Sequence, residues 1–166
     1  MERVELNEGL EKLGAADYLY EELYEGRVFE GTAIENIRIP STLRRIEKDT
    51  FNYCRELKRV EFLDGVEYLG EGCFASSGIK SITLPSTLET IDSCAFFECL
   101  YLRSIEIPDS VKNIGEDSFY GSEIEEITIP RDPDIGKGAF DMCWSLKTVR
   151  LRGGSPAWTP WRLEEL

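Results

Sequence analysis

Two columns of apolar residues recur along the chain every 21 to 23 residues, apart from a first interval of 33 between Val4 and Ile37, and this repeat limits the possible fold more than any other feature. The first column starts short stretches of alternating apolar and polar residues. The second column consists of phenylalanines. Repeats of this length predict a stacked structure, because one such unit is too short to enclose a core alone. The first column contains Val4, Ile37, Val60, Ile82, Ile105, Ile127 and Val149, and the second contains Phe29, Phe51, Phe74, Phe96, Phe119 and Phe140.

Residues 102–122 show the pattern of one unit most clearly. Ile105 and Ile107 alternate with polar residues, and a period of two is typical of a short strand with one buried face. Pro108 follows and ends the strand, because proline has no amide to donate to a strand ladder. A second extended piece, which ends at Ile114, returns along the other side. Each unit is therefore expected to contribute a strand, a return and a turn.

These motifs, above all residues 102–119, 79–99 and 139–146, resemble the BspA-like branch of the leucine-rich repeat proteins. The resemblance covers about residues 1–152. It implies a right-handed, α/β-type but mostly β solenoid of six coils plus a seventh strand, with a parallel sheet on one face. Members of this branch resemble surface adhesins and other binding proteins rather than enzymes. The matched positions are structural, so the resemblance assigns no functional residue.

An insertion at about residues 15–26 lengthens the first coil. Leu19 and Leu23 are four residues apart, as are Tyr20 and Tyr24, and this spacing places each pair on one face of a helix. We therefore expect a short, acidic, tyrosine-rich helix. Insertions in repeat proteins often carry binding, which makes Tyr20 and Tyr24 candidate contacts; the alternative is a lid over the first coil.

The repeat ends before residues 153–166, which contain Trp158 and Trp161. The open end of a solenoid exposes core side chains and an unpaired strand edge. We expect this segment to form a cap over the solenoid of residues 1–152. A binding hot spot built on the tryptophans is the alternative.

The cysteines occupy positions of the repeat that indicate a structural role. The residue three places after each phenylalanine alternates between a small hydroxyl residue and cysteine. Matching cysteines are therefore two units apart, about 10 Å at the usual strand spacing, which is beyond disulfide reach. No pair has the spacing of a metal site, so we expect reduced thiols and no bound metal. The six residues are Thr32, Cys54, Ser77, Cys99, Ser122 and Cys143.

The chain contains no histidine, and its net charge is −13. The missing histidine excludes serine–histidine and cysteine–histidine hydrolases and most zinc enzymes. The negative charge argues against binding to nucleic acid or an anionic membrane, both of which favour a basic surface. No apolar run approaches the roughly 18 residues that span a bilayer. We therefore expect a non-enzymatic protein without a cofactor.

Polar residues of the strands form columns on the exposed face of the predicted sheet. Solenoid proteins commonly bind partners with such a surface, although a plain solvated face is the alternative. Residues 61–145 carry 17 acidic and 5 basic residues, a charge that would steer a basic partner or simply maintain solubility. The candidate contacts on this face are Arg38, Arg59, Glu61, Ser81, Thr83, Glu106, Glu126 and Arg150.

Two functional hypotheses follow. The first is a small, acidic, cytoplasmic inhibitor, such as an immunity protein that neutralises a basic toxin; the charge, the size and a start unlike a signal peptide favour it. The second is a fragment of a BspA-like cell-surface adhesin that binds host or matrix proteins.

Overall fold

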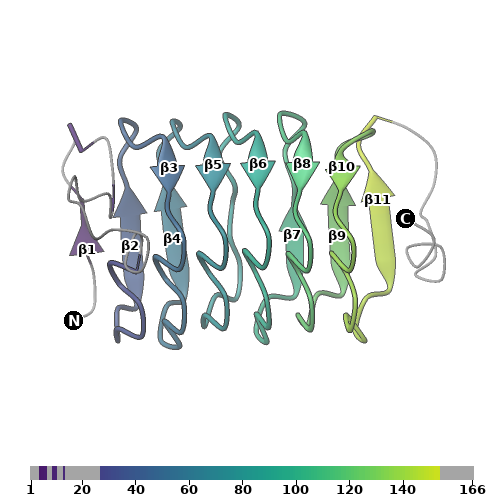
Figure 1. Cartoon of the computed structure of the whole chain (residues 1–166), viewed down its shortest axis with the longest axis horizontal. Coiled ribbons are helices and arrows are strands. Elements are labelled where there is room, and N and C mark those ends of the chain that lie inside the picture. The colour runs from purple at the N-terminus through teal and green to yellow at the C-terminus, as the bar shows by residue number, and fades with distance from the viewer. Residues whose placement is uncertain (1–3, 7–8, 11–12, 14–26, 154–166) are drawn as a thin grey trace, which may run out of the picture.

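The computed structural model describes residues 4–6, 9–10, 13 and 27–153. These residues form an elongated stack of coils, and we call each coil a rung (Figure 1). Five turns, from residue 36 to residue 147, are described in full, whereas the preceding coil is described in part. The fold is the mostly β, parallel-sheet solenoid that the repeat predicts. The described residues contain no helix, and hence none long and apolar enough to cross a membrane.

The strands of the I-x-I pattern line one face of the stack, which we call the sheet face. They pair in parallel and in the register of the repeat, so that Ile37 lies beside Val60 and Ile105 beside Ile127. Their inward side chains are buried and belong to one continuous core. The strands are β1 (Val4–Glu5), β2 (Asn36–Ile39), β4 (Arg59–Phe62), β7 (Ser104–Glu106), β9 (Glu126–Ile129) and β11 (Thr148–Leu151).

The sheet face has the predicted parallel strands, but it is divided in the middle. Residues 81–84, which occupy the fourth of the seven strand positions, are assigned no strand. The face therefore consists of two three-stranded sheets, β1-β2-β4 and β7-β9-β11. Ile82 and Leu84 are nevertheless buried in the common core, so the division affects the main-chain pairing rather than the apolar pattern.

A second parallel sheet runs uninterrupted along the opposite side of the stack, in the opposite direction (Figure 1). Each of its strands is the short extended return that the sequence predicts, with one buried aliphatic residue such as Ile46 or Ile91. Its strands are β3 (Arg45–Ile46), β5 (Tyr68–Leu69), β6 (Thr90–Ile91), β8 (Asn113–Ile114) and β10 (Asp134–Ile135). This sheet holds the third and fourth rungs together where the sheet face is divided.

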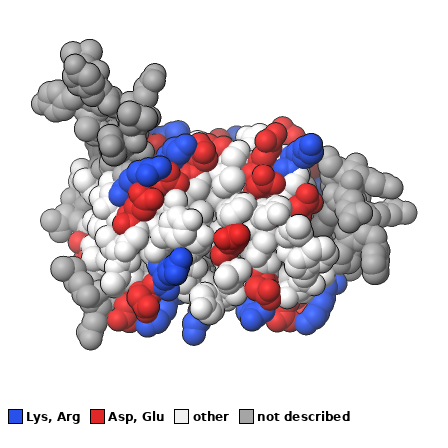
Figure 2. Space-filling view, turned by 60° about the horizontal axis from the view of Figure 1, so that its bottom comes forward, with Lys and Arg blue, Asp and Glu red and all other residues white. Residues whose placement is uncertain are grey.

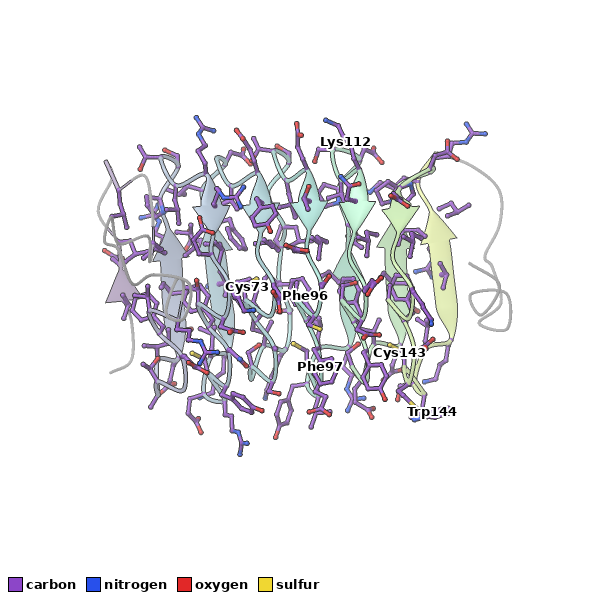
Figure 3. The ribbon with its side chains drawn as sticks, viewed as in Figure 1. Cys73, Phe96, Phe97, Lys112, Cys143 and Trp144 are labelled. Atoms are coloured by element: carbon purple, nitrogen blue, oxygen red, sulfur yellow. The ribbon has the colours of Figure 1, made fainter. Side chains whose placement is uncertain are left out.

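Stacked turns form the third side of the solenoid, and each carries one phenylalanine into the core. The six rings form a continuous column with centroid separations of 5.2–5.5 Å and nearly parallel planes. Phe96 lies inside this column, between the two sides of the stack (Figure 3). The second column of the repeat is thus a ladder of aromatic rings.

Each turn contains residues in the left-handed region of the backbone, which glycine adopts most easily. Glycine occupies some of these positions, such as Gly121 at φ 65°, whereas Glu98 occupies the same place one rung earlier at φ 50°. The amide of Glu98 donates to the carbonyl of Tyr120 in the next rung at 2.8 Å. The left-handed conformation therefore aims these amides along the stack.

Two predicted features lie outside the described residues. They are the helical insertion at about residues 15–26 and the capping segment at 153–166, of which the structure describes only Gly153. Both stay predictions.

Candidate functional site

The eight candidate contact residues all lie on the sheet face, but they do not form one site. They fall into a group at the division of the sheet, the neighbouring Arg38, and a group on the three C-terminal strands. Arg59 and Glu61 come from β4, and Ser81 and Thr83 come from residues 81–84 of the next rung, which are assigned no strand. Glu106, Glu126 and Arg150 come from β7, β9 and β11. The candidate contacts Tyr20 and Tyr24 lie outside the described residues.

A hollow of about 460 Å³ lies where the sheet face is divided, and we call it the sheet-face hollow. It is bounded on one side by β4 and on the other by residues 81–85. Four of the predicted contacts line it, namely Arg59, Glu61, Ser81 and Thr83. The other lining residues are Val60, Phe62, Asp64, Leu84 and Pro85. The structure thus brings half of the predicted contacts to one place.

Main-chain bonds that join the other rungs are missing at the hollow. Between the fifth and sixth rungs, the amide of Ile107 donates to the carbonyl of Thr128 at 2.8 Å. The equivalent bond between the third and fourth rungs would join the Phe62 amide to the Thr83 carbonyl. These two described residues do not form it. The Ser81 amide likewise makes no bond to the Lys58 carbonyl. The hollow therefore contains open donors and acceptors of the polypeptide backbone.

Two residues of the third rung depart from the repeat on the side of the hollow. Phe62 occupies a position that holds isoleucine or leucine in the other rungs, and its larger ring is only half-buried. Leu63 stands where the neighbouring rungs have proline, and its amide donates backward to the Ile39 carbonyl at 3.0 Å. The third rung is thereby fastened to the second rung, while a bulky ring faces the fourth.

Positive charge adds to this separation. Lys58, Lys80 and Arg103 occupy the same position in three consecutive rungs, and like charges directly opposite each other destabilise strand pairing. Lys58 is paired with Glu35 at 3.0 Å, and Arg103 pairs with an acidic residue of the following rung. In the described part of the chain, neither Lys80 nor Arg59 has an ion-pair partner. Both are exposed, and they leave unopposed positive charge at the hollow.

The two carboxylates at the hollow are engaged with neighbouring rungs. Glu61 faces Arg38 at 3.8 Å, which places Arg38 beside the hollow. Asp64 accepts hydrogen bonds from the amide and hydroxyl of Ser86, both at 3.3 Å. These contacts tie the rungs together, so the carboxylates do not stand free as a general acid and base.

Most charged residues along the solenoid are paired from rung to rung. Nine of the seventeen acidic residues in 61–145 form ion pairs, examples being Glu67 with Arg44 and Glu89 with Lys112. Figure 2 shows the result on one face, where cationic and anionic side chains lie next to each other rather than in separate patches. The acidic block is therefore weaker as a field than its composition indicates.

The C-terminal group of candidate contacts is held by ion pairs of the same kind. Arg150 contacts Glu126 at 2.6 Å, and Arg152 contacts Glu106 at 3.2 Å. Arg152 also donates through Nε to the Ile107 carbonyl at 3.0 Å. These carboxylates are already neutralised by their own chain, in contrast to the open groups at the sheet-face hollow.

The five cysteines are free thiols, of which Cys54, Cys73 and Cys99 are buried and Cys94 and Cys143 are partly buried. Burial raises the pKa of Cys99 to about 12 and that of Cys73 well above its ordinary value. A protonated thiol is a poor nucleophile and a poor metal ligand. In the described part of the chain, no cluster of cysteine and acidic residues could hold a metal ion.

An exposed apolar edge is the surface that the sequence analysis missed. It follows the turns, and Trp144 points away from the solenoid there (Figure 3). Trp144 is 84% exposed. In two earlier turns, the residues that directly follow the core phenylalanines, Phe97 and Tyr120, stack with their ring centroids 5.0 Å apart. Rungs with a cysteine three places after the phenylalanine have one more residue after the turn than rungs with serine or threonine there. Large exposed side chains lie on these alternate rungs. The exposed members are Tyr53, Leu100, Tyr101, Met142 and Trp144.

The hollow itself, and the residues Phe62, Asp64, Leu84 and Pro85 that line it, were not predicted from the sequence. Two signals in the sequence mark the place. The proline that ends the strand in neighbouring units is replaced by Leu63, and the aliphatic residue before it is replaced by Phe62. A comparison of the units position by position would have found both.

Comparison with known proteins identifies the repeat. The family model described as the BspA type leucine rich repeat region matches residues 24–147 in six copies. No curated protein matches the sequence.

Solved structures of bacterial leucine-rich repeat proteins are similar. A leucine rich cell surface protein from Faecalibacterium prausnitzii is 31% identical, with a TM-score of 0.69 over 72% of this chain and 32% of the other. A leucine-rich repeat protein from Bacteroides ovatus is 30% identical, with a TM-score of 0.57 over 75% of this chain and 39% of the other. The T. pallidum leucine rich repeat protein shares the fold, with 22% identity and a TM-score of 0.73 over 90% of this chain and 70% of the other. The chain spans about a third of the length of the F. prausnitzii protein.

Proposed function

The chain belongs to the BspA-type leucine-rich repeat family, and on that premise we propose that it is the protein-binding module of a cell-surface protein and binds through the sheet-face hollow. The observation that carries this proposal is the convergence of Arg59, Glu61, Ser81 and Thr83 on a hollow of about 460 Å³. This volume lies within the range of roughly 300–1,000 Å³ that is common for binding sites. The hollow is large enough for a few residues of a partner.

The solved structures favour the cell surface over the cytoplasm. The F. prausnitzii protein is described as a cell surface protein. The hypothesis of a small cytoplasmic inhibitor gains no support from these relatives. The adhesin hypothesis, in which the module binds host or matrix proteins, is therefore the one that we retain.

A binding role agrees with the chemistry of the hollow. Its carboxylates are engaged with Arg38 and Ser86, and its free groups are a guanidinium, two hydroxyls and the backbone. Such groups recognise a polypeptide by hydrogen bonds and charge. The expectation of a basic partner does not extend to this hollow, because Arg59 has no ion-pair partner there, whereas Glu61 faces Arg38 and Asp64 accepts hydrogen bonds from Ser86.

The proposal is tested by binding the purified chain to an array of extracellular matrix and cell-surface proteins. The decisive variant is Ser81→Lys with Thr83→Lys, which fills the hollow with two long side chains. The matched control is Thr90→Lys with Asn113→Lys, at outward positions of β6 and β8 in the second sheet. We expect the first variant to weaken binding by about tenfold or more, equivalent to about 1.4 kcal/mol, and the control to leave it unchanged.

A third variant distinguishes the exposed apolar edge from the hollow. Trp144→Ser removes the most exposed aromatic residue of that edge. Loss of binding with Trp144→Ser and full binding with the lysine variant at the hollow would contradict the proposal and assign the partner to the edge.

A further inference from the structure

Because the ladder bonds are missing at the sheet-face hollow, backbone amides and carbonyls there can bond to the main chain of a partner. The Phe62 and Ser81 amides are donors and the Thr83 and Lys58 carbonyls are acceptors, whereas the equivalent groups are paired within β1-β2-β4 and within β7-β9-β11. Exposed strand edges commonly take up an extended segment of a partner through such groups. These groups make no main-chain bond within the described part of the chain, so a peptide can bond to them without breaking a main-chain bond of the solenoid.

Charge adds a second requirement on the ligand. Arg59 lines the hollow and Lys80 directly precedes Ser81, and neither has an ion-pair partner in the described part of the chain. The nearby Lys58 and Arg103 are already paired with glutamates. A guanidinium without a partner binds a carboxylate well, because its planar fork can donate two hydrogen bonds.

We propose that the sheet-face hollow binds an extended peptide segment that carries a carboxylate side chain. This inference rests on the proposed function and names the class of ligand. The main chain of the peptide bonds to the open groups of Phe62, Ser81 and Thr83. Its carboxylate pairs with Arg59, and the ring of Phe62 provides an apolar contact for the side chains next to it.

The volume of the hollow also favours a short segment. About 460 Å³ accommodates a few residues rather than a folded domain. The intact second sheet and the phenylalanine column prevent the two rungs from separating further, since Phe74 and Phe96 stack at 5.5 Å across the same junction. The ligand therefore fits the hollow as a single strand, and the solenoid does not unfold to receive it.

The test uses the probe peptide Thr-Val-Glu-Val-Thr-amide, which carries fluorescein on its N-terminal amine, and follows binding by fluorescence anisotropy. Two matched peptides vary one feature each: lysine in place of the glutamate, and N-methylation of both valines. The protein variant is Arg59→Glu, and its control is Arg131→Glu, which makes the same charge change at an exposed residue before β10.

We expect the glutamate peptide to bind about tenfold more tightly than the lysine peptide. Arg59→Glu should reverse that preference, while Arg131→Glu should preserve it. N-methylation should remove binding, because the methylated amides cannot donate. Hydrogen exchange at the Phe62 and Ser81 amides should slow when the glutamate peptide is bound.

Equal affinity for the two charged peptides, or equal effects of the two arginine variants, would overturn the inference. If the array partner is lost with Ser81→Lys and Thr83→Lys but no probe binds, the proposed function stands and this inference fails. If neither the array nor the probes respond to changes at the hollow, both fail.

Discussion

The thiol of Cys99 donates a hydrogen bond to the carbonyl of Phe74, 25 residues earlier and one rung away, at 3.2 Å. The same sulfur lies 3.6 Å from the hydroxyl of Ser77, which follows Phe74 by three residues. A cysteine rung is thus joined to the hydroxyl rung before it. Cys54 and Cys143 make the equivalent bonds to Phe29 and Phe119, so the alternation seen in the sequence has a structural cause.

Cys99 should make stability depend on pH in the alkaline range. Its pKa is about 12 in the folded chain, against an ordinary value of 9.0, because burial disfavours the thiolate. The folded state therefore stabilises the protonated thiol. This contribution is complete below pH 9.0 and is lost as the pH rises towards 12.

Over that interval we expect the thiol to lower the free energy of unfolding by about 1.4 kcal/mol per pH unit. Urea denaturation of the native chain and of Cys99→Ser, at several pH values above about 8.5, measures the difference. The native chain should lose stability more steeply with pH. Parallel curves for the two proteins would contradict the assignment.

Removing a ring from the middle of the phenylalanine column should be costly. Phe96 is fully buried and stacks on Phe74 and Phe119, so Phe96→Ala should cost about 3–5 kcal/mol. Phe140 is partly buried and stacks on Phe119, so Phe140→Ala should cost less. Denaturant midpoints of the two variants provide the measurement, and an unchanged midpoint for Phe96→Ala would be inconsistent with the stacking.

The left-handed turn positions predict opposite effects of glycine at two neighbouring places. Gly121→Ala introduces a side chain at φ 65° and should destabilise the fold by about 1–2 kcal/mol. Glu98→Gly, at φ 50° in the preceding turn, should be neutral or stabilising by up to about 1 kcal/mol. Thermal or urea denaturation checks both. The reverse order of stability would show that side-chain contacts, and not the backbone, dominate at these turns.

Hydrogen exchange should reveal the open ladder directly. The amides of Phe62 and Ser81 lack the bonds that the equivalent amides of Ile107 and Glu126 make. We expect the first pair to exchange faster by about an order of magnitude or more, because an exposed, unpaired amide exchanges without a local opening step. Phe62→Ile should slow exchange at Ser81 if the phenyl ring keeps the rungs apart. Equal rates in the native chain would indicate a closed ladder.

The apolar columns were enough to predict the stack, the strand positions and the alternation of cysteine and hydroxyl residues, because each rests on a local pattern that repeats. Ile82 and Leu84 have that pattern too, which is why the sequence analysis expected a strand there. The pairing depends instead on the fit between rungs, and the residues that depart from the repeat at the hollow, Phe62 and Leu63, lie some twenty residues earlier.

The candidate site was predicted in part for the same reason. Alternation along a strand indicates that Arg59, Ser81 and Thr83 face outward, but it does not indicate which outward residues are paired. Glu126 and Arg59 look equally available in the sequence. In the structure Glu126 is occupied by Arg150 from the next strand, a contact that depends on side chains reaching across a rung.

The joined cysteine and hydroxyl rungs limit how a solenoid of this kind can change in length. Cys54 and Cys99 are 45 residues apart and are separated by the rung of Ser77. Deleting that single rung would place two buried thiols side by side, at a spacing of about 4.8 Å between strands. Neighbouring thiols at that distance could be oxidised to a disulfide, and Cys99 would lose its hydroxyl neighbour Ser77, while Cys54 would keep Thr32. A duplication or deletion that preserves these contacts must therefore comprise two rungs. The unit by which this solenoid can lengthen or shorten is thus about twice as long as its sequence repeat.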